Sequence, residues 1–336
     1  MTGRTRGWGA LLGVAALVIG SLAIPQSAQA APRCFGKRAT IVGTGHRDRL
    51  QGTPGRDVIV GLGGRDSIIG KSGRDLICAG GGSDTIRGKK GHDRMHGGSG
   101  GDIIFGQAGN DEMIGAGGGD ALLAGPGNDL MLAGPGFDVL IGGSGDDLFD
   151  GGPTPFDTAS FEESPVGVVV DLNLVAPQVT GEGTDTLTGI EGLVGSKGND
   201  VLTGQDLPSL TGNGLRGFGG ADQLYGMDGD DVLDGEAGND KGGPGVGLVS
   251  GGPGNDWVFG GFGDDDLYGD EGNDLLDGFE DEETTGDFGS GGPDLDECFG
   301  LESNDGTCET LAPLLAAAGR SARWRDLLLR HSPAAS

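Results

Sequence analysis

A nine-residue period runs without interruption from Gly43 to Asp150, and it restricts the possible folds more than any other feature of the chain. Twelve consecutive units fit this period. The sixth position is Asp in every unit, the eighth is always apolar, and the fourth is Gly in eleven units, with His46 as the exception. Such a strict short period predicts a stack of similar structural units.

The composition also argues against an ordinary globular core. The 336 residues include 76 Gly, and only 5% of the side chains are aromatic. The first position of the twelve units is Gly in nine and Ala in three. Glycine accepts a positive φ and leaves backbone carbonyl groups accessible, so the chain can turn sharply once in every unit.

The units read G-G-x-G-x-D-x-U-x, where U is apolar. Residues 97–105 (GGSGGDIIF) and 251–259 (GGPGNDWVF) match this pattern at every defined position. The pattern resembles the RTX, or haemolysin-type, calcium-binding repeat family, over about two thirds of the chain after residue 30. The resemblance implies an all-β fold, a parallel β-roll or β-solenoid. In that fold the first six residues of a unit form a turn, the last three form a strand, and two units complete a coil.

The chemistry of the unit favours calcium independently of the resemblance. Calcium takes six to eight oxygen ligands from carboxylates and backbone carbonyls, and each turn offers one Asp among accessible carbonyls. An ion between stacked turns would be shared by Asp residues eighteen positions apart. We predict that multiple Ca²⁺ ions bind Asp84, Asp93, Asp102, Asp111, Asp120, Asp129, Asp138, Asp147, Asp200, Asp222, Asp231, Asp240, Asp256, Asp265 and Asp274.

Metal binding and folding should be coupled. One buried apolar side chain in every nine residues compensates poorly for the entropy lost when the backbone is ordered. Stacked Asp residues would also repel one another in the absence of cations. We therefore predict that the chain folds when calcium binds.

The first four units carry Arg at the fifth position, where later units prefer Asn or Asp. A guanidinium group beside each Asp should weaken calcium binding, which predicts a partly metal-independent start of the stack. In the alternative interpretation, Arg47, Arg56, Arg65 and Arg74 point to solvent and these units bind metal like the others.

The period divides the chain into segments. The first β-roll block covers residues 31–150, with its twelve units at 43–150; an insert at 151–194 loses the period; and a second block covers 195–309. In the insert, residues 168–174 alternate like a half-buried strand, and Leu187, Ile190 and Leu193 predict further short strands. Residues 310–336 combine Leu and Ala at helical spacing with four Arg, which predicts a short basic amphipathic helix.

Residues 1–30 have the features of a secretory signal peptide. Arg4 and Arg6 precede an apolar stretch, and an A-x-A site places cleavage after Ala30. A secreted, extracellular location would allow the four cysteines to form disulfides, with three possible pairings. We favour Cys34–Cys78 and Cys298–Cys308, since this choice places one disulfide at each end of the repeat region.

Charge is unevenly distributed along the chain. Residues 31–110 carry 13 basic and 7 acidic side chains, whereas residues 111–309 carry 3 basic and 43 acidic ones. Such an acidic segment attracts cations and repels nucleic acid. We expect a monomer that binds calcium ions, binds no nucleic acid, and has a cell-surface or protein partner that the sequence does not identify.

The repeats leave little room for a catalytic domain, because the insert of about 44 residues is the longest stretch outside them. The sequence from His92 to His96 is similar to a zinc-protease motif, but Asp93 and Met95 are the sixth and eighth residues of a repeat. We predict a secreted calcium-binding protein without enzymatic activity, in a structural or adhesion role. The alternative is the calcium-dependent repeat region of a secreted hydrolase, such as a protease, a lipase or a polysaccharide-modifying enzyme.

Overall fold

The computed structural model describes residues 31–207, 211–241, 248–278, 287–301, 303–304 and 306–308. Their regular structure consists of β-strands, and no helix among them is long and apolar enough to cross a membrane. The chain from Pro32 onward forms one compact unit. The predicted signal peptide at 1–30 and the predicted helix at 310–336 lie outside the described residues.

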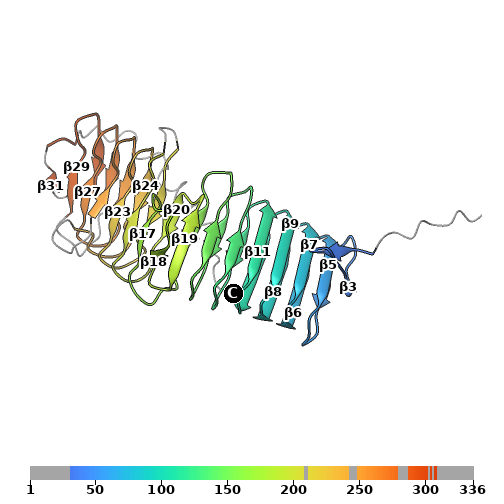
Figure 1. Cartoon of the computed structure of the whole chain (residues 1–336). Helices are drawn as coiled ribbons and strands as arrows, with labels where there is room; N and C mark the ends of the chain where they lie inside the picture. The colour runs from blue at the N-terminus through green and yellow to red at the C-terminus, as the bar shows by residue number, and fades with distance from the viewer. Residues whose placement is uncertain are drawn as a thin grey trace, which may run out of the picture. The chain divides into compact units, whose positions relative to one another are not determined.

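Apart from the strands at 33–38 and the insert strands at 169–188, the strands stack in parallel sheets, and consecutive strands alternate between the two sides of the stack (Figure 1). This alternation confirms the β-solenoid in which two units complete one coil. One sheet contains thirteen strands and runs through both repeat blocks: β4 (Arg49–Gln51), β6 (Ser67–Gly73), β8 (Thr85–Gly91), β10 (Ile103–Ala108), β12 (Ala121–Leu123), β14 (Val139–Ile141), β16 (Thr158–Ser160), β20 (Gly192–Val194), β22 (Gly214–Arg216), β24 (Val232–Asp234), β26 (Trp257–Phe259), β28 (Leu275–Asp277) and β30 (Glu297–Phe299).

The other side of the stack is divided into two sheets. The first has nine strands: β3 (Ile41–Val42), β5 (Val58–Gly63), β7 (Leu76–Gly81), β9 (Arg94–Ser99), β11 (Glu112–Gly117), β13 (Leu130–Leu132), β15 (Leu148–Asp150), β19 (Thr184–Thr188) and β18 (Gln178–Val179). The second has seven: β17 (Val169–Asp171), β21 (Val201–Thr203), β23 (Gln223–Tyr225), β25 (Leu248–Ser250), β27 (Asp266–Tyr268), β29 (Phe288–Ser290) and β31 (Ser303–Asn304).

The pairing register places equivalent positions of the repeat above one another. Ile104 of β10 pairs with Leu122 of β12, and Met113 of β11 pairs with Met131 of β13, each eighteen residues further along the chain. Strands β5 to β11 are longer than the three residues expected, because their pairing continues into the following turn. From β12 to β17, and in most later coils, the strands have the expected three residues.

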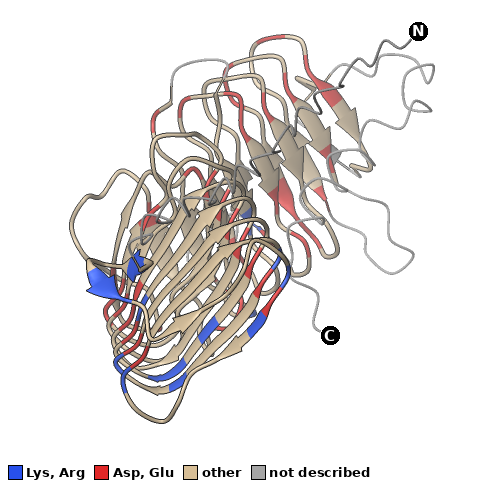
Figure 2. Cartoon of the chain, turned by 90° about the vertical axis from the view of Figure 1, so that its right-hand side faces the viewer, with Lys and Arg blue, Asp and Glu red and all other residues tan. Residues whose placement is uncertain are grey.

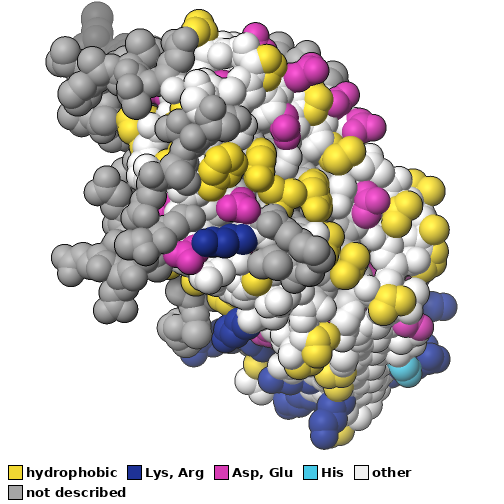
Figure 3. Space-filling model, turned by 90° about the vertical axis from the view of Figure 1, so that its left-hand side faces the viewer, with side chains coloured by type: hydrophobic (Ala, Val, Ile, Leu, Met, Phe, Trp, Pro, Cys, Tyr) yellow, Lys and Arg dark blue, Asp and Glu magenta, His cyan; other side chains and the backbone are white. Residues whose placement is uncertain are grey.

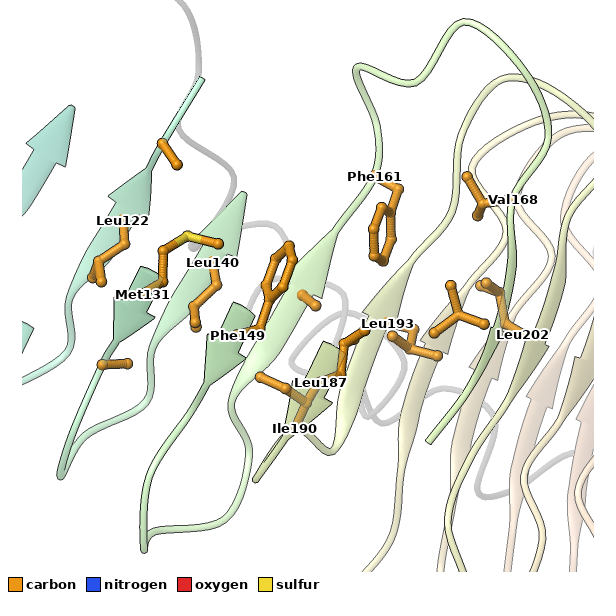
Figure 4. Packing of buried hydrophobic residues seen from close by; sticks show 14 of the residues in the cluster. Leu122, Met131, Leu140, Phe149, Phe161, Val168, Leu187, Ile190, Leu193 and Leu202 are labelled. Carbon is orange, nitrogen blue, oxygen red and sulfur yellow. The ribbon is translucent and has the colours of Figure 1, made fainter. Parts of the chain in front are cut away.

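The eighth residues of the units form a single core between the sheets, as their apolar character predicted. Every one from Ile59 to Phe149 is fully buried. Figure 4 shows this column of side chains passing from Leu122 through Phe149 and on to Leu202 of the second block. The stack is therefore held by one narrow core that continues through the insert.

A short hairpin, β1 (Arg33–Cys34) and β2 (Lys37–Arg38), covers part of the outer surface of the nine-stranded sheet. Cys34 packs there with Val58, Val60 and Leu76, and it forms a disulfide with Cys78. A second disulfide joins Cys298 and Cys308. Both favoured pairings are confirmed.

The insert is built into the stack. Strands β16 and β20 belong to the thirteen-stranded sheet, β19 extends the nine-stranded sheet, and β17 begins the seven-stranded one. Leu187 lies in β19 and Leu193 in β20, as predicted, whereas Ile190 lies between these two strands; all three side chains are buried. Where the divided side changes sheet, the Gln178 side chain acts like a backbone amide: its Oε1 accepts the Asp171 N–H at 2.7 Å, and its Nε2 donates to the Asp171 carbonyl at 2.9 Å.

Candidate calcium sites

The sixth-position Asp residues form rows that link each turn to the next coil. The backbone N–H of Asp93 donates to Oδ1 of Asp111 at 2.7 Å, and the N–H of Asp111 donates to Oδ1 of Asp129 at 2.6 Å. One row continues into the insert, where Asp147 N–H donates to Oδ1 of Asp185 at 2.8 Å. One carboxylate oxygen of each Asp is therefore committed to holding the stack together.

The other carboxylate oxygen, Oδ2, has no hydrogen-bond partner in fourteen of the fifteen predicted ligands. These side chains are deeply buried: Asp129 is 3% exposed and Asp256 is 0% exposed. A buried carboxylate oxygen without a partner is costly, so each of these positions favours a bound cation or a proton. The fourteen residues are Asp84, Asp93, Asp102, Asp111, Asp120, Asp129, Asp138, Asp147, Asp222, Asp231, Asp240, Asp256, Asp265 and Asp274.

A backbone carbonyl of the next coil lies close to the unpaired Oδ2, beside the glycine at the first position. A Cβ atom added to Gly106 would lie 2.6 Å from Oδ2 of Asp111 and 2.7 Å from the carbonyl oxygen of Ala124. At Gly70 the corresponding distances are 2.6 Å to Asp75 and 3.0 Å to the Gly88 carbonyl. In units that begin with glycine, the missing side chain allows two oxygen acceptors to approach one point, which is the kind of donor set that calcium takes. The units of Asp84, Asp129 and Asp138 begin with alanine instead.

Asn213 shows what occupies this space when the charge is removed. It stands at the sixth position of its turn, and its backbone N–H donates to Oδ1 of Asp231, as in the Asp rows. Its side-chain Nδ2 donates to the Gly226 carbonyl of the next coil at 3.0 Å. The amide N–H of Asn213, which is positively polarised, thus occupies the place that Oδ2 would take if this residue were Asp, facing the Gly226 carbonyl.

Side chains alone do not complete a coordination sphere. Within the described ranges, no three Asp, Glu, His or Cys side chains converge as a metal-binding group. Calcium requires six to eight oxygens, so backbone carbonyls and water would have to supply most of them. The histidines of the 92–96 motif also do not form a metal site; Nδ1 of His92 accepts the Asn110 N–H at 2.7 Å.

Burial raises the pKa of these carboxyl groups far above the ordinary value. The pKa is raised to about 7 for Asp120 and Asp129 and to about 8 for Asp256. Desolvation is the largest cause, and the charges of neighbouring Asp residues raise these pKa values further. The hydrogen bond from the preceding Asp N–H opposes both effects. Without a cation, such groups hold protons near neutral pH, so calcium binding should release protons.

Asp200 is the one predicted ligand whose Oδ2 is already occupied. The backbone N–H of Ser196 donates to this oxygen at 2.6 Å, and Ser196 Oγ donates to Oδ1 at 2.9 Å. The geometry of Asp200 therefore differs from that of the other fourteen, which no feature considered in the sequence had indicated.

Asp66, Asp75 and Asp157 are outside the predicted set and have the same open geometry. Asp66 and Asp75 each have an unpaired, buried Oδ2, although they follow Arg65 and Arg74. Both Arg side chains are exposed, as the alternative interpretation expected.

The third residue, Asp157, lies in the insert. It accepts the Asp138 N–H at 2.8 Å and also has an unpaired Oδ2. Its unit, residues 151–160, contains one extra residue, which hid it from a search at a fixed nine-residue period. A search that allowed one insertion between the paired glycines and the Asp would have found it.

One coil of the second block departs from the repeat pattern. The unit containing Asp240 has Gly242 where the apolar residue belongs, yet the coil is not left without an inward side chain. Val249 of β25 takes that role and is fully buried between its neighbours. The chain thus reaches the core seven residues later than the period requires.

The surface charge changes along the stack. All seven acidic residues in segment 31–110 are sixth-position Asp residues, buried except for the half-buried Asp48. Charged side chains at the surface of this segment are therefore almost entirely Lys and Arg, which gather in the coils nearest the viewer in Figure 2. On the face in Figure 3, Lys and Arg likewise lie mostly below Asp and Glu.

Stacked nonapeptide turns with rows of buried, open carboxylates define a β-solenoid of the calcium-binding type. The family model for the RTX calcium-binding nonapeptide repeat matches residues 42–77, 79–113, 88–122, 123–153, 216–241 and 242–276, together just over half of the chain. The chain belongs to this family and is a calcium-binding repeat protein. Comparison with curated proteins found no match.

Proposed function

We propose that this is a secreted, non-enzymatic protein that binds multiple calcium ions along its solenoid and folds as they bind. The rows of buried Asp Oδ2 atoms without partners, several of them beside a backbone carbonyl of the next coil, carry this proposal. Burying many ionised carboxylates without counter-ions opposes folding, whereas the same oxygens become ligands when calcium is present. The free energy of metal binding then becomes free energy of folding.

A location outside the cell fits this coupling. Extracellular fluid supplies calcium at concentrations that suit weak sites, with dissociation constants of about 10⁻⁴–10⁻³ M. The Cys34–Cys78 and Cys298–Cys308 disulfides are stable in such an oxidising environment. Residues 1–30 would direct export and would be removed after Ala30.

We assign the folded solenoid a structural or surface-association role. The early coils expose mainly Lys and Arg, and the later coils are acidic, so the two parts can engage surfaces of opposite charge. The net negative charge of residues 111–309 opposes binding to nucleic acid. We propose that the protein is a monomer.

The alternative function, the repeat region of a secreted hydrolase, is less well supported. The insert at 151–194 was the longest stretch that could have held catalytic residues, and its strands β16, β17, β19 and β20 are rungs of the solenoid. The insert thus serves the same architecture as the repeats, which favours the non-enzymatic proposal.

Two measurements on the chain beginning at Ala31 test the proposal. At about pH 8, far-UV circular dichroism should show β-structure in saturating calcium and a largely disordered chain after calcium removal. Native mass spectrometry should count many ions per chain. Magnesium, which keeps its water ligands and demands strict octahedral geometry, should substitute poorly. An unchanged spectrum, or a chain that binds no calcium, would refute the proposal.

A further inference from the structure

The second residue of the unit adopts one of two backbone conformations. In most units it has a positive φ, and its N–H points to the next coil. Gln107 (φ 75°) donates to the Ala124 carbonyl at 2.6 Å, and Ala116 (φ 85°) donates to the Ala133 carbonyl at 2.8 Å. In three units with an Asp at the sixth position, those of Asp48, Asp57 and Asp200, the N–H instead turns inward and donates to Oδ2 of the unit's own Asp at 2.6 Å. In the Asn213 unit, the Gln205 N–H also turns inward and donates to Oδ1 of Asn213 at 3.1 Å.

In the three Asp units the inward-turned residues are Thr44, Thr53 and Ser196, and their hydroxyl groups stabilise this second conformation. Thr53 Oγ1 donates to Oδ2 of Asp57 at 3.0 Å and accepts the Gly55 N–H at 3.2 Å. Ser196 Oγ likewise accepts the Gly198 N–H at 2.9 Å while donating to Asp200. Hydroxyl side chains commonly stabilise turns by bonding to a backbone group two residues further on.

The division between the two conformations follows the sequence. Units with a hydroxyl at the second position have an occupied Oδ2. Units with an unpaired Oδ2 have glycine there or one of the following residues, all with positive φ: Leu62, Lys71, Lys89, Gln107, Ala116, Phe218, Met227, Glu236 and Asp270. In the insert, the hydroxyl of Thr180, one residue earlier in its unit, donates to Oδ2 of Asp185.

We propose that a Ser or Thr hydroxyl in the first two positions closes a unit to calcium, and that units without one remain open. In a closed unit the Asp Oδ2 already accepts hydrogen bonds, so a cation would have to displace them and approach the positive ends of their dipoles. The inference rests on the calcium-coupled folding proposed above. It excludes Asp48, Asp57, Asp185 and Asp200, and it adds Asp66, Asp75 and the insert residue Asp157 as calcium ligands.

The same switch explains why one unit lacks glycine at its fourth position. In most open units this residue has a positive φ, as at Gly109 (φ 138°), where an added Cβ would clash with the Gly91 carbonyl oxygen. In the closed unit with Thr53, the fourth residue is Gly55, which lies outside the positive-φ set and has open space around it. His46 follows Thr44 in another closed unit, and there too a side chain is tolerated at this position.

A reciprocal exchange tests the proposal. Ala116→Ser introduces the closing hydroxyl into an open unit, and Ser196→Ala removes it from a closed one; alanine already occupies this position with positive φ at Ala116. Native mass spectrometry of the calcium-loaded full-length mature chain should count fewer ions in Ala116→Ser and more in Ser196→Ala. Ser99→Ala, which removes an exposed hydroxyl from a third position, is the matched control and should leave the count unchanged.

The outcomes separate this inference from the proposed function. If the unmodified chain folds and binds calcium while both exchanges leave the ion count unchanged, the switch is wrong and the calcium-folded solenoid stands. If the unmodified chain binds no calcium, the proposed function itself fails. Circular dichroism in saturating calcium confirms that each variant is folded. Ser196→Gly, which adopts positive φ without strain, repeats the opening test if the alanine variant does not fold.

Discussion

Removing calcium should make the stability of the solenoid strongly dependent on pH. The pKa of Asp129 is raised from 3.8 to about 7 in the folded chain, mainly by desolvation. A difference of about three units corresponds to at most about 4 kcal/mol for ionising this one carboxyl group in the calcium-free fold. The net stability of a domain is only about 5–15 kcal/mol, so a few such ionisations suffice to unfold it.

The direction of the effect follows from the sign of the shift. A carboxyl group with a raised pKa in the folded state contributes stability below its unfolded pKa, and this contribution is lost as the pH rises through the folded value. The relevant values run from about 6 at Asp93 and Asp102 to about 8 at Asp256. The calcium-free chain should therefore be most structured in mildly acidic solution and should unfold as the pH approaches about 8.

The assay is far-UV circular dichroism of the chain, freed of calcium on a chelating resin and titrated from about pH 5 to about pH 8. With saturating calcium the β-signal should remain across this range. In the variant carrying Asp120→Asn, Asp129→Asn, Asp138→Asn and Asp147→Asn, the loss of structure should shift to higher pH, because the amide does not titrate and Asn213 shows that it fits. A calcium-free signal that is constant, or that grows with pH, would refute the reasoning.

Three further predictions concern single elements of the structure. Asp129→Asn should raise the calcium concentration at half-folding about tenfold, equivalent to roughly 1.4 kcal/mol, whereas an unchanged midpoint in a calcium titration would remove Asp129 from the ligands. Gly109→Ala should destabilise the calcium-loaded chain by roughly 3 kcal/mol in denaturant unfolding. Gly55→Ala should change the stability by no more than about 0.5 kcal/mol, because the nearest atom to the added Cβ would be Thr53 Oγ1 at 3.9 Å. Equal losses in the two variants would contradict the two turn conformations. Replacing Cys34 and Cys78 with Ser should cost about 2–4 kcal/mol in the same assay, and no loss would show that the hairpin does not contribute to stability.

The features repeated in every unit could be predicted from the sequence. Twelve occurrences of Asp at the sixth position and an apolar residue at the eighth fixed the register, and the structure places the carboxylates in rows and the apolar residues in the core. The disulfide pairing was also correct, since the cysteines lie near the two ends of the periodic region.

Features that depend on a single residue escaped the prediction. Oδ2 of Asp200 is occupied because the Ser196 N–H donates to it. The repeat pattern allows any residue at the second position, so it does not separate Ser196 from the residues that leave Oδ2 unpaired. Asp157 was missed because one added residue shifted it out of register. The hydrogen bonds between the Gln178 side chain and the backbone of Asp171, at the end of β17, were also missed. They form only when the chain of the insert has folded into the stack.

One side of the stack is a continuous sheet and the other is divided, and this difference determines how far the folding of one repeat block depends on the other. The thirteen-stranded sheet crosses the insert unbroken, while the opposite side ends one sheet at β18 and begins another at β17. In a solenoid each coil is stabilised mainly by its immediate neighbours, so this junction is where cooperativity between coils is weakest. When the calcium concentration falls, one block can unravel up to the insert and stop there. The other block then remains as a template on which the lost coils can reform.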